Sequence, residues 1–443
     1  MQDRKAFDGL DGDTVTATPF SVDGERLRRD IERNAQFGAV PTEEGQARTV
    51  LPGTEPNRGA RQHLVDRMIQ AELTVDVDAV GNIAGTWEPD SCDPDAPPVA
   101  VGSHLDSVPY GGIFDGPLGV YAGLEAVRAL QSAGTPVSRP VTVVSFTGEE
   151  GTRFADGVLG SSVAAGQLDA DVALDRSDGT ETLEEALAEI GFHGEGRLDA
   201  SSWHAWLELH VEQSDRLEQW GLPAGVVTTI SGTTRLHVTI DGKADHTGTT
   251  PMAARSDALA AASELVLTLE RVAQSETEHS DTAVATVGEL TVDPGAVNVV
   301  PGKVELSADI RDVEYTVIKR IVGAVHDELA SLEDDRGVAT AVECSYDVAP
   351  VDMAPRCRKA LHDAGDAVGV GTTDIHSGAG HDSMQIARVT DAGLLFAPSD
   401  NGHSHNKLEW TDWPACTATT EILTAALASL AGDVNEQDAT RSK

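Results

Sequence analysis

The sequence predicts an α/β fold in which a doubly wound mixed sheet is interrupted by an inserted, smaller α+β domain. Apolar strand patterns alternate with amphipathic helix patterns over the first half of the chain, which is typical of doubly wound sheets. The pattern then changes to strands in which apolar and polar residues alternate, as expected for a sheet with one exposed face. At 443 residues the chain is also longer than a single hydrophobic core usually needs, so two domains are expected.

The first part of the larger domain is expected within residues 1–225. Its helices are predicted from apolar residues that recur at helical spacing, and Ser21 is a candidate cap for the first of them. Its strands are short apolar runs between turn-forming residues, and the proline-rich, acidic stretch 88–98 is expected to be a loop. In chain order the expected elements are helices at 21–34 and 59–73, a strand-like stretch at 75–87, a strand at 98–102, a helix at 118–131, and strands at 141–146 and 206–210.

Residues 226–349 are expected to form the inserted domain, and residues 350–443 to complete the larger one. The insert has the element order βαββαβ, which fits a ferredoxin-like α+β layer. The two chain ends, up to residue 20 and from residue 433, are expected to be loose. The expected elements are strands at 235–240, 282–292, 303–311 and 340–348 with helices at 253–272 and 316–332, then a helix after 351, a strand at 394–396 and a helix at 415–430.

The chain is strongly acidic, with a formal net charge of −41. The acidic residues are spread along the sequence, and only seven of the 32 basic residues are lysine. Such a surface resembles that of proteins from salt-loving organisms, in which salt screens the repulsion between acidic groups. A basic binding partner is the alternative explanation. Nucleic-acid binding requires clustered lysine and arginine, so nucleic acid is not an expected partner.

The composition also indicates a soluble protein with reduced cysteines. The four cysteines are far apart in sequence and none forms a Cys-x-x-Cys pair, which argues against a zinc–thiolate site or a disulfide framework. The apolar runs are much shorter than the roughly 20 residues of a membrane span, and the N-terminus lacks the apolar stretch of a signal peptide. We therefore expect a cytoplasmic protein with no membrane partner.

Candidate metal ligands follow several of the predicted strands. Ligands of doubly wound domains bind beyond the carboxyl ends of the strands, so these side chains are expected to lie together. Imidazole and carboxylate groups bind zinc, manganese or cobalt used as Lewis acids. Two such ions can share a carboxylate and activate a water molecule, so the sequence predicts a two-metal hydrolase. The candidate ligands are His104, Asp115, Glu150, His210 and either His403 or His405, between which the spacing does not decide.

The two adjacent glutamates after the strand at 141–146 are assigned different roles. Adjacent side chains point in different directions, so Glu150 is interpreted as a ligand and Glu149 as the general base. The carboxylate of Asp106 is expected to hold the second ring nitrogen of His104. Taken alone, each of these features has a simpler interpretation, such as a solvated acidic turn for the glutamates or a structural role for a single histidine.

Short motifs along most of the chain carry a resemblance to a known family. The motifs are GSHLDS (102–107), GIFDGPLGV (112–120), FTGEEGTRF (146–154), LHVEQ (209–213), ADHTGTTPM (244–252), NVVPG (298–302), DIR (309–311), SGAGHD (377–382) and SHN (404–406). Over roughly residues 34–421 the chain resembles the M20 metallopeptidase-type amidohydrolases of the hydantoinase/carbamoylase branch. This branch includes N-carbamoyl-L-amino acid hydrolases, allantoate amidohydrolases and β-ureidopropionases.

The resemblance implies a complete active site. It implies a dinuclear centre that binds two divalent ions, which can be Zn, Mn, Co or Ni, and it selects His405 over His403. It also implies that the inserted domain pairs two subunits in a homodimer, and this domain is expected to act as a lid. The implied metal ligands are His104, Asp115, Glu150, His210 and His405, the implied base is Glu149, and the implied substrate contacts are Gln213, His246, Asn298, Arg311, Gly380 and His381.

The implied reaction is hydrolysis of the C–N bond of an N-carbamoyl (ureido) acid, such as an N-carbamoyl-L-amino acid, with release of ammonia and CO2. A metal-bridging hydroxide attacks the carbamoyl carbon, Glu149 moves the proton, and His246 stabilises the oxyanion. Arg311 can bind the carboxylate of this small-molecule substrate through two hydrogen bonds, and Asn298 can add a donor.

Alternatives stay open at this point. The structural alternative for Arg311 is an ion pair with Asp309 or Asp312. An N-acyl amino acid deacylase or an exopeptidase on the same fold is the second candidate function, and a non-catalytic metal-binding module is the third. The chain departs from the family pattern at 214–215, where Ser-Asp replaces Gly-Pro, and at Ser383, where alanine is common. These departures concern substrate preference and remove no catalytic group.

Overall fold

The computed structural model describes residues 20–154 and 157–432, which form two compact units. Of the described residues, the first unit comprises those up to Thr228, Met353–Ile375 and those from His381 onward. The second unit comprises Thr229–Asp352 and His376–Gly380. The chain ends that the sequence predicts to be loose lie outside the described residues, apart from residue 20.

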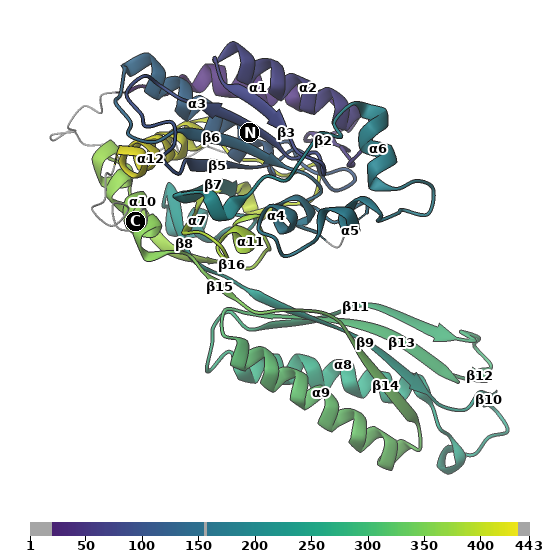
Figure 1. Cartoon of the computed structure of the whole chain (residues 1–443). Helices are drawn as coiled ribbons and strands as arrows, with labels where there is room; N and C mark the ends of the chain where they lie inside the picture. Colours follow the sequence, from purple (N-terminus) through teal and green to yellow (C-terminus); the bar gives the residue numbers. More distant parts are fainter. Residues whose placement is uncertain (1–19, 155–156, 433–443) are drawn as a thin grey trace, which may run out of the picture. The chain divides into compact units, whose positions relative to one another are not determined.

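Within the described residues, nine strands form one mixed sheet (Figure 1). The strands are β3 (Thr74–Val77), β4 (Ile83–Trp87), β5 (Val99–His104), β6 (Val141–Phe146), β7 (Ala205–Val211), β8 (Ala224–Ile230), β15 (Val351–Asp352), β16 (Thr372–Ser377) and β17 (Ala392–Ala397). Their order is β15-β8-β17-β7-β5-β6-β4-β3, and β16 also pairs with β8. The central strands β17, β7, β5 and β6 run parallel, while β8 is antiparallel to β17, β4 to β6, and β3 to β4. Every residue of the four central strands is buried, as expected when helices cover both faces.

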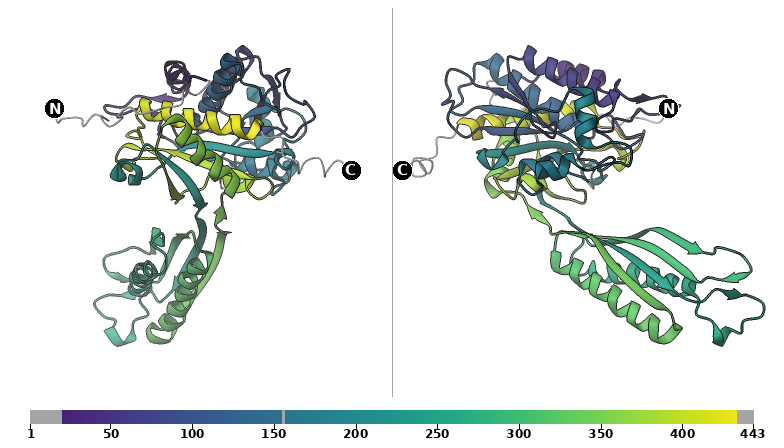
Figure 2. Two further views of the ribbon diagram at one scale, coloured as in Figure 1. Left: turned by 90° about the vertical axis from the view of Figure 1, so that its left-hand side faces the viewer. Right: turned by 45° about the vertical axis from the view of Figure 1, so that its right-hand side comes forward.

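Helices lie on both faces of this sheet (Figure 1 and Figure 2). On one face α1 (Gly24–Asn34), α3 (Pro117–Ala133), α10 (Pro355–Val368) and α12 (Trp413–Gly432) pack together, and α3 and α12 contact the central strands. On the other face α4 (Leu159–Ala164) contacts β6, and α11 (Ser383–Ile386) contacts β7 and β17. This is the doubly wound arrangement that the alternation of strand and helix patterns predicts.

One of the described helices, α12, is long and apolar enough to cross a membrane when judged by length and composition. Its side chains Cys416, Leu423 and Leu427 are fully buried, and it contacts α3, α10 and β17. These contacts are those of a core helix packed inside the first unit.

Several element boundaries differ from those that the sequence predicts. α1 begins at Gly24, because the side chain of Asp23, and not that of Ser21, accepts the N–H of Arg26 and caps the helix. The helix expected at 59–73 is α2 (Glu55–Gln70), which begins earlier. The extended stretch expected at 75–87 is a hairpin of β3 and β4. The shorter elements of this unit that the sequence did not predict include β1 (Ala39–Val40), β2 (Ala47–Arg48), α4, α5 (Ala170–Leu174), α6 (Leu183–Ile190), α7 (Arg216–Trp220), β8, β16 and α11.

The second unit has the element order βαββαβ and, over its described residues, a four-stranded antiparallel sheet. Its elements are β9 (Gly232–Asp241), α8 (Ala258–Glu276), β11 (Val284–Asp293), β13 (Lys303–Asp312), α9 (Tyr315–Arg336) and β14 (Ala339–Val348), with the sheet order β11-β13-β9-β14. Along β9, Leu236, Val238 and Ile240 are buried in the core that α8 and α9 complete (Figure 1). The residues between them are polar and at least partly exposed. This alternation is that of a sheet with one face under helices and one face free of them.

A small ladder extends this unit beyond the main sheet. β10 (Asp245–His246) pairs with β12 (Val299–Val300), so that His246 lies opposite Val299. The helix expected at 253–272 begins later, at Ala258, because Asp257 caps it by accepting the N–H groups of Leu259 and Ala260.

Candidate metal centre

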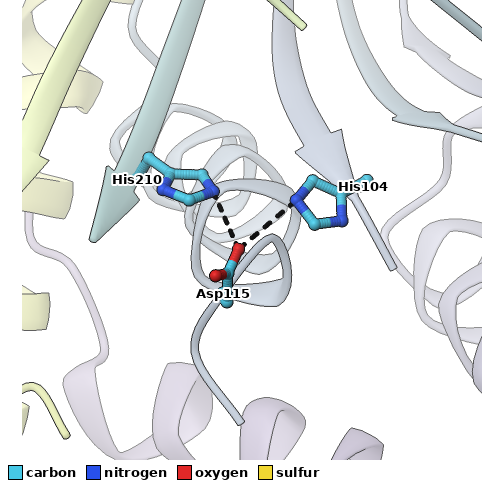
Figure 3. Close-up of side chains that lie close together, drawn as sticks. All are labelled: His104, Asp115 and His210. Carbon is cyan, nitrogen blue, oxygen red and sulfur yellow. Dashed lines mark ion pairs between the residues drawn. The ribbon is translucent and has the colours of Figure 1, made fainter. Parts of the chain in front are cut away.

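Two histidines at the ends of neighbouring strands face the same carboxylate. His104 is the last residue of β5 and His210 is the penultimate residue of β7. Asp115 lies in the turn that leads into α3. The Nε2 atoms of His104 and His210 are 3.5 and 3.2 Å from Asp115 Oδ1. Dashed lines in Figure 3 mark these two ion pairs. All three side chains are buried, so the parallel strands hold two imidazoles around one oxygen at the edge of the sheet.

The second oxygen of Asp115 faces a different pair of side chains. His405 Nε2 is 3.5 Å from Asp115 Oδ2 and 3.4 Å from Glu150 Oε2. The side chain of His405 is 52% exposed, whereas that of Glu150 is 3% exposed. Asp115 therefore links a buried group, formed with His104 and His210, to a half-open group formed with Glu150 and His405.

The geometry of these side chains fits divalent ions. Ligand atoms about 2.0–2.2 Å from a tetrahedral ion lie about 3.4 Å from one another. The distances of 3.2–3.5 Å between the imidazole nitrogens and the carboxylate oxygens match this spacing. His104 Nδ1 lies 3.2 Å from the carbonyl oxygen of Asp106, and His210 Nδ1 lies 3.0 Å from that of Val211. Because a carbonyl only accepts, both Nδ1 atoms carry the hydrogen and both Nε2 atoms are left for a metal.

The role of Asp106 differs from the one that the sequence predicts. Its carboxylate is 3.7 Å from His104 Nδ1, farther than its own carbonyl oxygen. The carboxylate instead accepts the backbone N–H groups of Glu149, at 3.3 Å, and Glu150, at 3.1 Å. The carboxylate of Asp106 therefore binds the turn after β6 and not the imidazole of His104. The physical reason is that the two backbone N–H groups of this turn have no partner in the sheet and need an acceptor.

Glu149 lies close to the buried group. Its Oε2 is 3.7 Å from His104 Nε2, and its side chain is 12% exposed. Burial raises the pKa of Glu149 well above its usual value; Asp382 and Glu150 raise it further, while His104 opposes the shift. Burial likewise raises the pKa of Glu150, with Asp115 adding to the effect. Both glutamates therefore hold protons readily in the metal-free chain.

The charge states of the other side chains complement those of the glutamates. Burial would raise the pKa of Asp115, but its hydrogen bonds with His104 and His210 outweigh burial and lower the pKa well below its usual value. Burial would lower the pKa of His104 and of His210, but Glu149 and Asp115 around His104, and Asp115 beside His210, raise both. Asp115 is thus an anion and the histidines retain protons, which a metal has to displace.

Gln213 also reaches this site. It follows β7, has a left-handed backbone with φ of 61°, and donates from Nε2 to Asp115 Oδ2 at 2.9 Å and to Ser404 Oγ at 3.1 Å. Its Oε1 is buried and has no hydrogen-bond partner among residues 20–154 and 157–432. A strained backbone and an unpaired buried acceptor are both costly, and both are typical of a functional position.

A buried polar network that the sequence did not predict lies behind the strand ends. Glu208 Oε1 accepts the hydroxyl of Ser103 at 2.8 Å. Glu208 Oε2 accepts the N–H of Ser383 at 3.0 Å and its hydroxyl at 2.6 Å. Ser383 Oγ in turn accepts the indole N–H of Trp206 at 2.8 Å. The one sequence signal for this network is Ser383 itself, which stands where the resembling family commonly has alanine.

The positions of His381 and His403 differ. The ring of His381 packs edge-on against that of His210 at 4.5 Å between centroids, and burial lowers its pKa well below the usual value. His381 is therefore a neutral, buried imidazole beside the candidate ligands. His403 follows the short helical turn Asp400–Gly402, and among the described residues it belongs to none of the groups that could hold a metal.

The remaining predicted substrate contacts belong to the second unit. Arg311 Nε and Nη2 donate to Asp309 at 2.7 and 3.2 Å, and Nη1 donates to the carbonyl oxygen of Gly378 at 2.9 Å. The ion pair with Asp309, one of the alternatives left open by the sequence, is thus present. The carbonyl oxygen of Asn298 accepts the N–H of Thr247, next to His246, and all three residues are accessible to solvent. Gly380 ends the short segment His376–Gly380 of this unit, which begins with the last two residues of β16.

A mixed doubly wound sheet with candidate imidazole and carboxylate ligands at its strand ends is the arrangement typical of metal-dependent hydrolases. Residues 100–429 match the model of Peptidase family M20/M25/M40, and the chain belongs to this family. It is an amidohydrolase of the hydantoinase/carbamoylase type.

Three known proteins support this placement. The N-carbamoyl-L-amino-acid amidohydrolase of Paenarthrobacter aurescens is 39% identical over 92% of this chain and 98% of its own length. The ureidoglycolate hydrolase of Arabidopsis thaliana is 33% identical over 96% and 90%. The crystal structure of a hydantoinase/carbamoylase family amidase from Burkholderia multivorans superimposes with a TM-score of 0.87 at 35% identity, covering 94% of this chain and all of that one.

Proposed function

We propose that this chain is a two-metal hydrolase that cleaves the C–N bond of an N-carbamoyl (ureido) acid such as an N-carbamoyl-L-amino acid. Water adds to the carbamoyl carbon, the amine of the acid leaves with a proton, and the remaining carbamate decomposes to ammonia and CO2. The observation that carries the proposal is the convergence of three imidazole Nε2 atoms on the two oxygens of Asp115. The relative from P. aurescens, similar over nearly its whole length, supports the choice of substrate class.

Two divalent ions, Zn, Mn, Co or Ni, would share Asp115. His104 and His210 would complete the buried half of the centre, and Glu150 and His405 the half-open one. When bound, the ions would polarise the carbamoyl oxygen and make water more acidic. The mixed nitrogen and oxygen ligand set is accepted by each of these metals, so the proposal does not depend on one of them.

Glu149 would act as the general base. Asp106 fixes its backbone, and its carboxylate lies beside the buried half of the centre. Burial raises the pKa of Glu149, which suits a group that takes up and returns a proton. In this role Glu149 takes the proton from the attacking water and delivers it to the leaving nitrogen.

The substrate contacts would come from both units. Gln213 offers its unpaired Oε1 to a carbamoyl N–H group. Arg311 donates from Nε and Nη2 to Asp309 and from Nη1 to the carbonyl oxygen of Gly378. One hydrogen on Nη1 and one on Nη2 are left to bind a substrate carboxylate. His246 and Asn298 add a further donor each, and His246 would stabilise the oxyanion. With Gly380 and His381, the proposed substrate contacts are Gln213, His246, Asn298, Arg311, Gly380 and His381.

The proposal includes the oligomeric state of the protein and its location in the cell. The inserted unit, expected at residues 226–349 from the sequence, would act as a lid and pair two copies of the chain in a homodimer. The enzyme would act on a small molecule in the cytoplasm. An N-acyl amino acid deacylase or exopeptidase remains the second candidate, because the same metal chemistry hydrolyses those amides. The third candidate, a non-catalytic metal-binding module, does not fit a chain that belongs to the amidohydrolases.

A substrate panel tests this function. The protein is stripped of metal with a chelator, reloaded in separate samples with Zn, Mn, Co or Ni, and assayed in molar salt. The ureido substrates are an N-carbamoyl-L-amino acid, 3-ureidopropionate, allantoate and ureidoglycolate, with ammonia as readout; an N-acetyl-L-amino acid and a dipeptide are the comparison, with free amine as readout. We expect at least one ureido acid to be cleaved about tenfold faster than either comparison substrate. Faster cleavage of the acetyl compound or the dipeptide would establish the second candidate instead, and full activity in metal-free protein would refute the metal centre.

A further inference from the structure

A single buried arginine connects two of the segments that carry candidate ligands. Arg48, on β2, is fully buried. Its Nη1 donates to the carbonyl oxygen of Leu105 at 3.1 Å, and its Nη2 to those of Asp106 and Asp115, both at 3.3 Å. Its Nε donates to the carbonyl oxygen of Gly112 at 3.1 Å. The guanidinium therefore ties the residues directly after His104 to the turn that carries Asp115.

A buried glutamate holds the same turn from the other side. Glu409 is 1% exposed, and its Oε1 accepts the N–H of Phe114 at 3.2 Å and of Asp115 at 3.0 Å. Its Oε2 accepts the hydroxyl of Ser404, which precedes His405, at 3.4 Å. The approach is so close that a Cβ at Gly112 would lie 2.1 Å from Glu409 Oε1. Only glycine at position 112 permits this contact.

The electrostatics of the pair are unusual for groups that only fill a core. Burial lowers the pKa of Arg48, although Glu409, Asp115 and Glu150 oppose the shift. Burial raises the pKa of Glu409 to about 7. Burying two ionisable groups costs free energy that a well-packed apolar pair would not cost. The cost is understandable where the hydrogen bonds set the position of a backbone that must be held accurately.

We propose that Arg48 and Glu409 are positioning residues that hold the backbone of Asp115 by its carbonyl oxygen and its N–H, so that one carboxylate serves both halves of the centre. Arg48 sets the distance from Asp115 to His104 through the backbone at 105–106. Glu409 sets the distance from Asp115 to His405 through Ser404. This inference rests on the proposed metal centre and assigns to it two residues that bind no metal themselves.

Cobalt binding tests the inference without relying on turnover. Metal-free protein is titrated with Co²⁺, and affinity and stoichiometry are measured by equilibrium dialysis while the visible absorption of bound Co²⁺ reports its coordination. The variants are Arg48→Lys, Arg48→Met, Glu409→Gln and Glu409→Leu. The amide of the Glu409→Gln variant still offers a carbonyl oxygen to the two N–H groups and an NH₂ group to Ser404, so it rescues a positioning role, whereas leucine does not.

The matched controls are a buried arginine and a buried glutamate remote from the site. Arg128 donates to Asp30 and to the carbonyl oxygen of Arg67, and Glu125 accepts the N–H of Asp23. Arg128→Met and Glu125→Gln therefore remove comparable buried interactions between helices of the first unit. The melting temperature of each metal-free variant measures how much stability the substitution costs.

We expect Glu409→Leu and Arg48→Met to weaken binding of at least one Co²⁺ by about 10- to 100-fold and to change the absorption spectrum. Arg48→Lys should lose less Co²⁺ affinity than Arg48→Met, and Glu409→Gln should bind Co²⁺ nearly as tightly as the wild type. The control variants should keep wild-type affinity and spectrum, even where their melting temperature falls as much or more. Should Arg48→Met or Glu409→Leu fail to fold, a wild-type affinity in Arg48→Lys together with a loss in Glu409→Gln would contradict the inference. Two wild-type Co²⁺ sites in all variants, or equal losses in the controls, would also overturn it. A wild-type protein that binds no Co²⁺ would instead refute the metal centre itself.

Discussion

Gln213 Nε2 donates to Asp115 Oδ2 at 2.9 Å, and this is the carboxylate oxygen that also faces His405. The amide of Gln213 is thereby oriented with its nitrogen toward the candidate ligands, and its Oε1 is left without a partner among the described residues. A side chain that is fixed at one end and unpaired at the other is poised to accept a hydrogen bond from a bound molecule.

We predict that Gln213→Ala lowers kcat/KM for a ureido acid by about 10- to 100-fold, because a lost hydrogen bond to a buried group is worth about 1–3 kcal/mol. Metal content should change little. The control is Gln219→Ala, since the Gln219 side chain donates to Asp215 within its own exposed helical turn. Steady-state kinetics and elemental analysis of both variants test this prediction. Unchanged kinetics in Gln213→Ala would show that Gln213 Oε1 does not bind the substrate.

The adjacent glutamates should separate into a base and a ligand. Glu149→Gln keeps the shape of the side chain but removes the proton acceptor, so turnover should fall by about 10² to 10⁴ while both metal ions remain bound. Glu150→Gln, the matched change one residue later, should lower metal content, because Glu150 Oε2 faces His405 Nε2 at 3.4 Å. Elemental analysis and turnover are measured on the same samples. The reverse pattern would exchange the two assignments.

Metal occupancy should distinguish His405 from His403. His405→Ala should lose one of two ions and His403→Ala neither, since only His405 lies beside Asp115 and Glu150 in the part of the chain that the structure describes. The side chain of His405 is half-exposed, whereas those of His104 and His210 are buried. A chelator should therefore remove the ion beside His405 faster than the ion held by His104 and His210. Timed dialysis against a chelator with metal analysis checks both points. Simultaneous loss of both ions from wild-type protein would argue against two unequal halves.

The stability of the metal-free protein should fall as the pH rises. The folded-state pKa values of His104, His210, Glu149 and Glu150 are all raised, so the folded chain binds more protons than the unfolded chain above their ordinary pKa values. Their contribution is present at lower pH and is lost as the pH rises through the folded-state pKa values. Asp115, with a lowered pKa, has the opposite sign, and its contribution is lost only in strong acid. Melting temperatures of metal-free protein should therefore decrease as the pH rises above the ordinary histidine pKa of about 6.5.

The metal-loaded protein provides the control for this pH dependence. Ligands bound to metal have already released their protons, so its melting temperature should depend less on pH over the same range. Glu149→Gln should also reduce the slope in metal-free protein, because it removes one group with a raised pKa. A metal-free protein that becomes more stable with rising pH would contradict the assigned direction of these shifts.

The acidic composition predicts a dependence on salt. With a net charge of −41, repulsion is strong where the Debye length is about 30 Å, at about 0.01 M salt, and weak where it is about 3 Å, at about 1 M. The melting temperature should rise steeply with KCl, and dialysis into dilute buffer should inactivate the enzyme. The metal concentration is held constant throughout. A melting temperature that stays flat from dilute to molar KCl would show that the acidic surface is simply solvated.

Local sequence was sufficient to locate the strand-end side chains. His104, Glu150 and His210 each follow a short apolar run, and such runs become buried parallel strands whose ends share one edge of the sheet. The central strand at 141–146 was predicted with its observed bounds. Helix starts were less accurate. The reason is that Ser21 has a side chain suited to capping, and only the folded backbone shows that Asp23 is the residue whose side chain reaches the free N–H groups.

The sequence by itself determined the alternation of strands and helices, the acidic surface and the residue types gathered at the strand ends, because these follow from short-range patterns of apolar and polar residues. The tertiary structure alone decided which groups touch. It showed that Asp106 holds the 149–150 turn rather than His104, and that Arg48 and Glu409, far apart in the chain, both bind the backbone of Asp115. Hydrogen bonds between residues distant in sequence depend on how the elements pack, and no local pattern records that packing.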